Sequence, residues 1–239
     1  MFRVYFDGSQ GAEALSLAAV IADASVWDAL SEDWGAMLAR QGLTHFHMKE
    51  AMRRKGEFRG WDPERHEWFI HAMVSVIKMH YHKAAGRMEI ITTSVDLDAH
   101  RELSQTIPGL PPAARMCARG LFAKCVNWWS DRSDKVLPPL EAFFDRNEPF
   151  MDHVRRDWLS AEFTRQHPAW HLVRDIAPVE MRSTPGVQVA DVFAWTRNRR
   201  EAKSNDDFYV MSLGLMNSLG QHFAFDRAKL ETYPPFELG

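Results

Sequence analysis

The stretch STPGVQVADVFAW, residues 183–195, predicts the start of a helix that carries an acid into an apolar surface. Thr184 is a favourable N-cap residue, and Pro185 suits the first helical position because its fixed backbone angle matches the helix. Asp191 has apolar neighbours four residues before and after it, so we expect it to be partly buried. A buried carboxylate is costly unless it is paired, hydrogen-bonded or bound to a metal. Gln188 lies on the same side of the helix, which therefore presents a polar pair on an apolar face.

Two further aspartates end apolar strands elsewhere in the chain. Residues 2–7 alternate in the manner of a strand, with three apolar side chains on one face and Asp7 on the other, and the run stops at a glycine and a serine. Residues 140–145 form a second apolar run that finishes on Asp145. Two strand ends and one helix start thus each carry an aspartate, which predicts that three acids converge on a divalent-cation site.

Strands and helices alternate along the chain after an opening hairpin. The patterns predict strands over residues 2–7, 15–22, 89–98, 140–145 and 171–181, and helices over 26–40, from 62 onward, and over 113–130, 149–166 and 206–220. This alternation is typical of an α/β fold, here a mixed sheet with helices on both faces, whose functional residues gather outside the strand ends. We expect a single domain over residues 1–239, with a helical insertion at about 26–85.

Composition excludes several classes of function. The net charge is −3, so a role on nucleic acid requires local basic patches or metal ions to offset the phosphate charge. The sequence predicts neither a signal peptide nor an apolar run long enough to span a membrane, and we expect a cytoplasmic protein without a membrane partner. Cys117 and Cys125 fall eight residues apart in one predicted helix, about 12 Å apart, which is too far for a disulfide.

The three aspartates lie in motifs that resemble a known family. The opening strand continues into Asp7-Gly8-Ser9, a middle strand ends in Asp145, and Ser183 is followed by Pro-Gly-Val-Gln-Val-Ala-Asp up to Asp191. In order and spacing these motifs resemble the bacterial and phage proteins catalogued as the domain of unknown function number 3800, which have a ribonuclease H-like fold. The resemblance runs from Met1 to about Arg200, and its last motif is the most specific.

The resemblance implies a metal-dependent nuclease that acts on DNA or RNA. Asp7 would bridge two Mg²⁺ or Mn²⁺ ions, and Asp145 and Asp191 would each complete the ligands of one ion. Carboxylates are hard ligands that suit these cations, and two such ions are able to drive an in-line displacement at phosphorus. Ser9, His47 and Gln188 would position the substrate or support the ligands.

One departure from the family pattern bears on activity. The family usually has an acid directly after its first aspartate, where this chain has Gly8. Ribonuclease H-like sites often add a glutamate as a fourth ligand, for which Glu50 and Glu148 are the nearest candidates. Gly8 favours an alternative function, a catalytically inactive module of the same fold that binds nucleic acid or protein. Hydrolysis of a small nucleotide or phosphate ester is a third, weaker hypothesis.

Other polar residues have simpler interpretations. His66 and His71 mimic a zinc-binding helix, but five residues on a helix leave their rings about 140° apart, which excludes a shared metal. His45 and His47 would share one face of a strand, from which they could reach a metal or a phosphate, but an exposed pair or a pair with partners in the core is the simpler interpretation. Two basic clusters, residues 53–59 and 197–203, are candidates for holding phosphates, although solvated surface is the simpler interpretation of each.

Overall fold

The structure is a computed structural model, and it describes residues 1–131, 138–148, 150, 153, 155, 173–202 and 219–233. The elements, in chain order, are β1 (Phe2–Gln10), β2 (Ala14–Asp23), α1 (Ala24–Gln41), α2 (Met48–Met52), η1 (Gly56–Phe58), α3 (Pro63–Lys83), β3 (Met88–Asp96), α4 (Leu97–Leu103), α5 (Ala113–Ser130), β4 (Leu140–Asp145), β5 (Val173–Val179), η3 (Met181–Ser183), α8 (Pro185–Glu201), β6 (Gln221–Phe225) and α10 (Arg227–Glu231).

The six described strands form one mixed sheet in the order β5-β4-β1-β2-β3-β6. Strands β1, β2 and β3 are antiparallel neighbours, whereas β4 runs parallel to β1, β5 parallel to β4, and β6 parallel to β3. In the parallel pair of β1 and β4, Phe6 is aligned with Phe144. The residues that follow them, Asp7 and Asp145, therefore reach the same edge of the sheet side by side.

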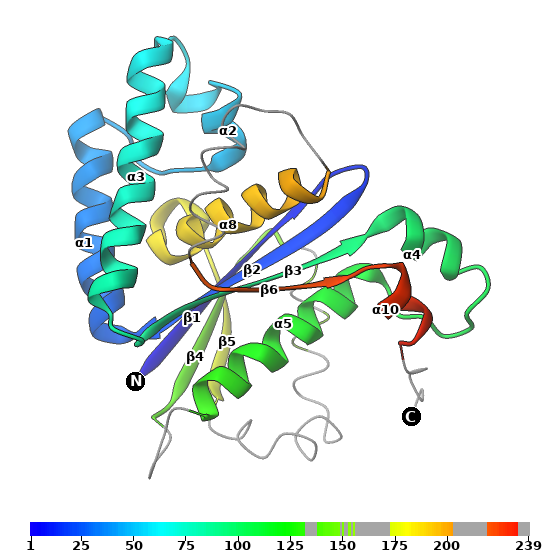
Figure 1. The fold of residues 1–239 in the computed structure, drawn as a ribbon. Coiled ribbons are helices and arrows are strands. Elements are labelled where there is room, and N and C mark those ends of the chain that lie inside the picture. The colour runs from blue at the N-terminus through cyan, green and yellow to red at the C-terminus, as the bar shows by residue number, and fades with distance from the viewer. Residues whose placement is uncertain are drawn as a thin grey trace.

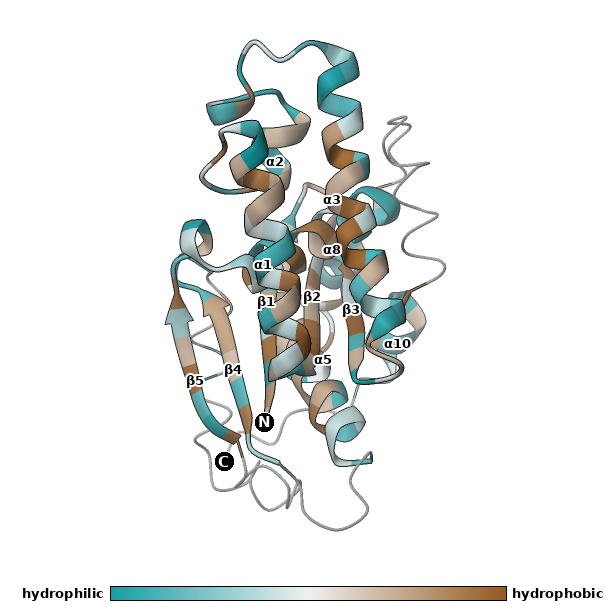
Figure 2. Cartoon of the chain, turned by 90° about the vertical axis from the view of Figure 1, so that its left-hand side faces the viewer, coloured by the Kyte–Doolittle hydropathy of each residue, from teal (hydrophilic) through white to brown (hydrophobic). Residues whose placement is uncertain are grey.

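Helices cover both faces of this sheet (Figure 1). Helices α1, α3 and α8 pack on one face, where Trp34, Phe69 and Phe193 belong to one buried apolar cluster. Helix α5 packs on the other face with α4 and α10, where Phe6 and Phe122 belong to a second cluster. Figure 2 shows the hydrophobic colour concentrated on the central strands and on the helix sides turned toward them. The expected α/β class, a mixed sheet with helices on both faces, is confirmed.

The strand and helix patterns of the sequence explain this layering. In β1, the apolar side chains of Val4 and Phe6 belong to the α5 face, whereas Tyr5 packs on the α8 face, as period-two alternation requires. In α3 the large apolar residue Trp68 would be predicted from its type to lie in the core, but it is 52% exposed, whereas its neighbour Phe69 is fully buried. The apolar run there is continuous, so helical spacing alone did not identify the buried residue.

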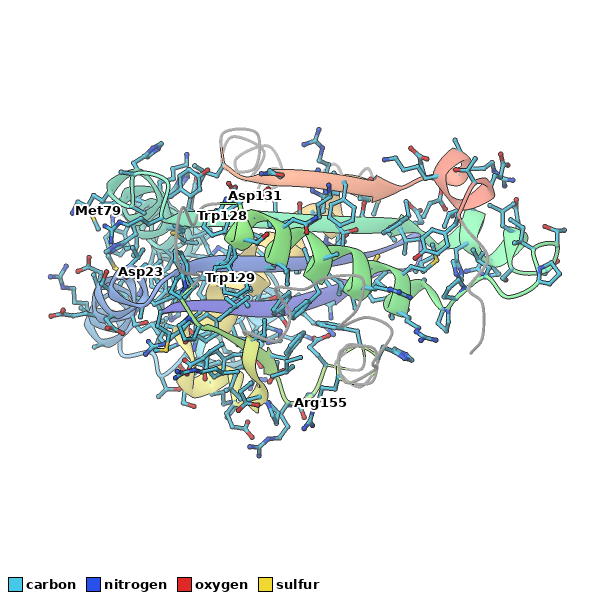
Figure 3. All side chains as sticks on the ribbon, turned by 90° about the horizontal axis from the view of Figure 1, so that it is seen from below. Asp23, Met79, Trp128, Trp129, Asp131 and Arg155 are labelled. Carbon is cyan, nitrogen blue, oxygen red and sulfur yellow. The ribbon has the colours of Figure 1, made fainter. Side chains whose placement is uncertain are left out.

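Trp128 and Trp129 lie next to each other at the end of α5 (Figure 3), and both are buried. The indole nitrogen of Trp128 donates a hydrogen bond of 3.1 Å to Glu89, and its ring meets Phe2 edge-on at 6.0 Å. Cys117 and Cys125, on the same helix, are buried free thiols, and burial raises the pKa of Cys117 to about 12. Both cysteines are therefore structural rather than reactive.

The structure differs from the sequence-based elements at the later strands. Strand β5 ends at Val179, before the expected end at 181, and the expected start at 171–172 lies outside the described residues. Strand β6 was not anticipated because its mixed sequence, QHFAF, resembles a loop. The expected helices over 149–166 and 206–220 lie almost wholly outside the described residues. Between β2 and β3 the chain forms α1, α2, η1 and α3, and the expected single domain over residues 1–239 stays a prediction. Among the described helices, none combines the length and apolar character needed to cross a membrane.

Candidate metal centre

Helix α8 lies directly against β1 because a glycine faces the strand at its start. A Cβ atom on Gly186 would fall 2.4 Å from the ring of Tyr5, so any larger residue would push the helix away from the sheet. This close approach brings Asp191 to the strand ends that carry Asp7 and Asp145. The start of the helix departs from expectation in one respect, because Thr184 occupies the N-cap position without a capping hydrogen bond from its side chain.

The three predicted aspartates are brought together and are buried. Asp7 is 2% exposed, Asp145 is 8% exposed and Asp191 is 4% exposed. Burial, followed by the charges of Asp191 and Glu148, raises the pKa of Asp7 well above its ordinary value. The three carboxylates, which come from β1, β4 and α8, therefore lie close enough to interact electrostatically, and the sequence predicted that they converge.

Asp191 also fixes the segment that follows α1. The backbone N–H of Met48, the first residue of α2, donates a hydrogen bond of 2.7 Å to Asp191 Oδ2. Burial raises the pKa of Asp191, and the nearby His47 and this hydrogen bond act in the opposite direction. One oxygen of the carboxylate therefore has a structural partner, and His47 is held beside the acids.

One buried carboxylate oxygen among these acids has no hydrogen-bond partner. Asp145 Oδ1 is inaccessible to solvent and is unpartnered within the described part of the chain. A buried polar atom without a partner is costly and requires an explanation, such as an ion. Asp145 lines a hollow of about 350 Å³ together with Asp7, Asp191, Glu148 and His47. The donor set consists of carboxylate oxygens, which suits Mg²⁺ or Mn²⁺.

The acids do not form a closed ligand shell as they stand. In the residues that the structure covers, no group of three or more His, Cys, Asp or Glu side chains has the geometry of a metal site. Carboxylates that face one another repel, and such a shell closes when the charge of a cation offsets that repulsion. The raised pKa of Glu148, which burial and its acidic neighbours bring to about 7, reports the same repulsion.

The predicted residues around the acids have different surroundings. Gln188 is fully engaged in structure: its Oε1 accepts from Trp34 and from the backbone of Phe46, both at 2.9 Å, and its amide nitrogen donates to the carbonyl of Met181 at 2.9 Å. It does not line the hollows described here. Ser9 and His47, in contrast, both line an adjoining hollow.

This adjoining hollow carries positive charge. This cationic hollow has a volume of about 500 Å³, and cationic side chains form part of its wall. These cations are Lys49, Arg53 and Arg199. It adjoins the hollow lined by the aspartates, the acidic hollow, with which it shares Gly8, His47, Glu148 and Asp191. Lys49 was not anticipated from the sequence, because it lies apart from both basic clusters. Of the later cluster, Arg197 is 5% exposed and so is not the solvated surface residue expected from a charge run.

Glu148 is the acid that sequence reasoning left undecided, and the structure places it beside Asp7. Glu50 lines the same acidic hollow, but its carboxylate lies 3.6 Å from His45 Nε2 and 3.9 Å from His47 Nδ1. The buried His45 is therefore a partner in the interior, as its simpler interpretation predicted. No sequence signal separated the two glutamates, because their distances from Asp7 depend on turns.

Comparison with known proteins finds similar solved structures but no matching family. No family model matches the chain, and no curated protein matches it. Among solved structures, two chains of Bst ribonuclease HIII are similar, one in complex with Mn²⁺ (TM-score 0.43, 12% identity) and one a point variant (TM-score 0.43, 12% identity). The matches cover 97% and 96% of this chain, which spans 65% and 64% of theirs. At this TM-score the likeness carries no argument about function, and the fold class rests on the sheet described above.

Proposed function

We propose that the chain is a divalent-metal-dependent nuclease that hydrolyses phosphodiester bonds of DNA or RNA, with Mg²⁺ or Mn²⁺ held by Asp7, Asp145 and Asp191. The observation that carries the proposal is that Asp145 lines a hollow with the other two aspartates while its Oδ1 atom is buried without a hydrogen-bond partner among the described residues. The family resemblance of the motifs and the carboxylate donor set support the same function. When bound, the ions supply Lewis acidity and an activated water for an in-line displacement at phosphorus.

In this proposal one hollow would bind the metal ions and the adjoining hollow would bind the phosphates of the substrate. Asp7, on the central strand β1, interacts electrostatically with both Asp145 and Asp191, and the three carboxylates would together hold the ions. Lys49, Arg53 and Arg199, which line the adjoining hollow, would hold the phosphates on one side of the bond that is cleaved. His47 lines both hollows and is placed to orient a phosphate beside the acids. Because the whole chain has a net charge of −3, binding of a polyanion depends on these local cations.

Substitution of Asp191 tests the proposal. Asp191→Asn should abolish cleavage of labelled single- and double-stranded DNA and RNA in Mn²⁺ while leaving the circular dichroism spectrum unchanged. A matched control is Asp98→Asn, which removes a 60% exposed carboxylate from α4 on the opposite face of the sheet and should retain activity. Equal cleavage by the Asp191 variant and the wild type would rule the mechanism out.

A catalytically inactive binding module of the same fold is the second candidate, and Gly8 favours it because the family pattern has an acid there. Titration calorimetry with Mn²⁺ separates the two functions. The nuclease should take up Mn²⁺ in a manner that depends on Asp7, Asp145 and Asp191, whereas the binding module has no need to do so.

A further inference from the structure

The position after Asp7 has no room for a side chain. A Cβ atom on Gly8 would fall 2.7 Å from Phe150 Cε1, 2.8 Å from Glu148 Oε2 and 2.9 Å from Leu17 Cδ2. Separations below about 3 Å are far inside van der Waals contact, so neighbouring atoms would have to move. The space that an acidic side chain at position 8 would enter is therefore already filled, and one of the groups that fill it is itself a carboxylate.

A short turn places Glu148 in that space. Strand β4 ends at Asp145, and the backbone N–H of Glu148 donates a hydrogen bond of 3.1 Å to the carbonyl of Asp145. Phe150, two residues later, is 2% exposed and meets Phe144 edge-on at 5.8 Å, so it anchors the turn in the core. The geometry of the turn thus fixes where the Glu148 carboxylate lies.

The Glu148 carboxylate faces the predicted ligands. It lies close enough to Asp7 for the two carboxyl groups to share a hydrogen bond, and it lines both the acidic and the cationic hollow. Within the described residues it has no ion-pair partner, whereas the Glu50 carboxylate lies 3.6 Å from His45 Nε2 and 3.9 Å from His47 Nδ1. A second observation, which does not depend on Glu148, is that Asp145 lines the same acidic hollow and that its Oδ1 atom is buried without a hydrogen-bond partner in the described part of the chain.

We propose that Glu148 supplies the fourth carboxylate of the metal centre, and that it does so through the space that Gly8 leaves open. The inference rests on the proposed metal site and deepens it, because it assigns the ligand that the sequence could not. The acid absent from position 8 is thereby replaced from the turn after β4. With Glu148 as a ligand, the site keeps the same number of carboxylates as a site that has an acid at position 8. The glycine at position 8 then no longer implies an inactive site.

Calorimetric titration of the full chain with Mn²⁺ tests the ligand. Removing a group at the metal typically costs tenfold or more in affinity, so Glu148→Gln should weaken Mn²⁺ binding by about tenfold to a hundredfold. Glu50→Gln is the matched control from the same hollow, and it should change the affinity by no more than about twofold. Thermal melts of each variant without metal establish that the fold is retained.

A paired substitution tests the exchange between positions 8 and 148. Gly8→Asp alone should lower the melting temperature and weaken Mn²⁺ binding, because the new side chain collides with Glu148. In the Glu148→Ala background the same substitution should instead strengthen Mn²⁺ binding, by about tenfold relative to Glu148→Ala alone, since an acid then occupies the vacated space. If Gly8→Asp weakens binding equally in both backgrounds, the two positions do not share one role.

The outcomes separate this inference from the proposed function. If Asp191→Asn weakens Mn²⁺ binding but Glu148→Gln binds as tightly as the wild type, the three-aspartate site stands and Glu148 is not a ligand. If the wild type takes up no Mn²⁺, or if Asp191→Asn leaves binding unchanged, both proposals are contradicted. If both variants bind more weakly and Glu50→Gln does not, both are supported.

Discussion

Beneath helix α8, the same face of the sheet carries two polar clusters with opposite charge patterns. The acidic cluster, at the ends of β1 and β4, consists of Asp7, Asp145, Glu148 and Asp191. The histidine cluster lies toward the last turn of α8 and consists of Thr92, Ser94, Arg197, Glu201 and His222. Both lie at or near the interior, and each has to resolve the cost of keeping polar groups away from water.

The histidine cluster balances its charges internally, because Glu201 faces both Arg197 and His222. His222 Nδ1 lies 3.0 Å from the hydroxyl of Thr92, and Glu201 Oε1 lies 3.5 Å from His222 Nε2 and 3.7 Å from Arg197 Nη1. The hydrogen bond from His222 lowers the pKa of Glu201, so its charge is stabilised within the fold. Such a network links α8 to β3 and β6 through groups of opposite charge, although the Nε atom of Arg197 is also buried without a hydrogen-bond partner among the described residues.

The acidic cluster resolves the cost only in part. Its members carry the same charge, the pKa values of Asp7, Asp191 and Glu148 are raised, and one oxygen of Asp145 has no partner. The contrast teaches that burial of polar groups alone does not mark a functional site. Like charges gathered beside a hollow are the better sign of a functional site, because a bound ligand of opposite charge is able to balance them.

The largest expected effect is the rise in Tm on Mn²⁺ binding, which should depend on the acidic cluster and not on the histidine cluster. A ligand at about 100 times its Kd stabilises the folded state by about 2.7 kcal/mol, which corresponds to a rise in Tm of about 5–11 °C for a chain of this size. Asp7→Asn should eliminate this rise with Mn²⁺, and it should also raise the Tm of the metal-free protein at pH 8, since one of several repelling charges is lost. Differential scanning fluorimetry measures both, and an undiminished Mn²⁺ shift would contradict the assignment.

The next effect concerns the glycine that sets α8 over both clusters. Gly186→Ala places a Cβ atom 2.4 Å from Tyr5 and should destabilise the protein by about 1–3 kcal/mol. Gly35→Ala on α1 is the matched control, because nothing lies within 4 Å of its Cβ position, and it should be neutral or stabilising by up to about 1 kcal/mol. Chemical denaturation compares the two, and equal destabilisation would argue against the close approach of α8.

A similar or smaller effect is expected in the histidine cluster. Glu201→Gln removes the charge that faces His222 and Arg197, and it should destabilise the fold by about 1–2 kcal/mol. The Mn²⁺-dependent rise in Tm should remain as in the wild type, because no ligand of the acidic cluster is touched. Loss of the metal response in this variant would mean that the two clusters are not independent.

The last effect is the pH dependence of the metal-free protein, which should differ in sign between the clusters. The pKa of Glu148 is raised to about 7 by burial, so its stabilising contribution is fully present below its ordinary value of 4.5 and is lost as the pH rises through about 7. The pKa of Glu201 is lowered, so its contribution is present above 4.5 and is lost as the pH falls below that value.

Denaturation curves of charge-removing variants between pH 4 and 9 check these signs. Glu148→Gln should gain stability over the wild type as the pH rises above about 7, whereas Glu201→Gln should lose its disadvantage as the pH falls toward 4. Matching pH profiles for the two variants would show that the charge patterns are not opposed.

The acidic cluster was largely predictable from the sequence, and the histidine cluster was not. Asp7 and Asp145 end clear apolar strands, and Asp191 stands alone in an apolar helix, so local patterns sufficed to select them. Glu148 depends on a turn, and no local pattern reports where a turn delivers a side chain. His222 lies on β6, whose sequence alternates too weakly to predict a strand. Gln188 was selected for its place beside Asp191, but only the structure shows that all its described hydrogen bonds hold other segments.

The central claim is that Asp7, Asp145 and Asp191 meet on one divalent-cation site. Anomalous diffraction from crystals soaked in Mn²⁺ tests it most directly. We expect at least one anomalous peak in the acidic hollow, with each of the three aspartates contributing an oxygen at about 2.0–2.6 Å from a peak. Saturating Mn²⁺ with no peak in the acidic hollow, or peaks bound solely at other surfaces, would contradict the account.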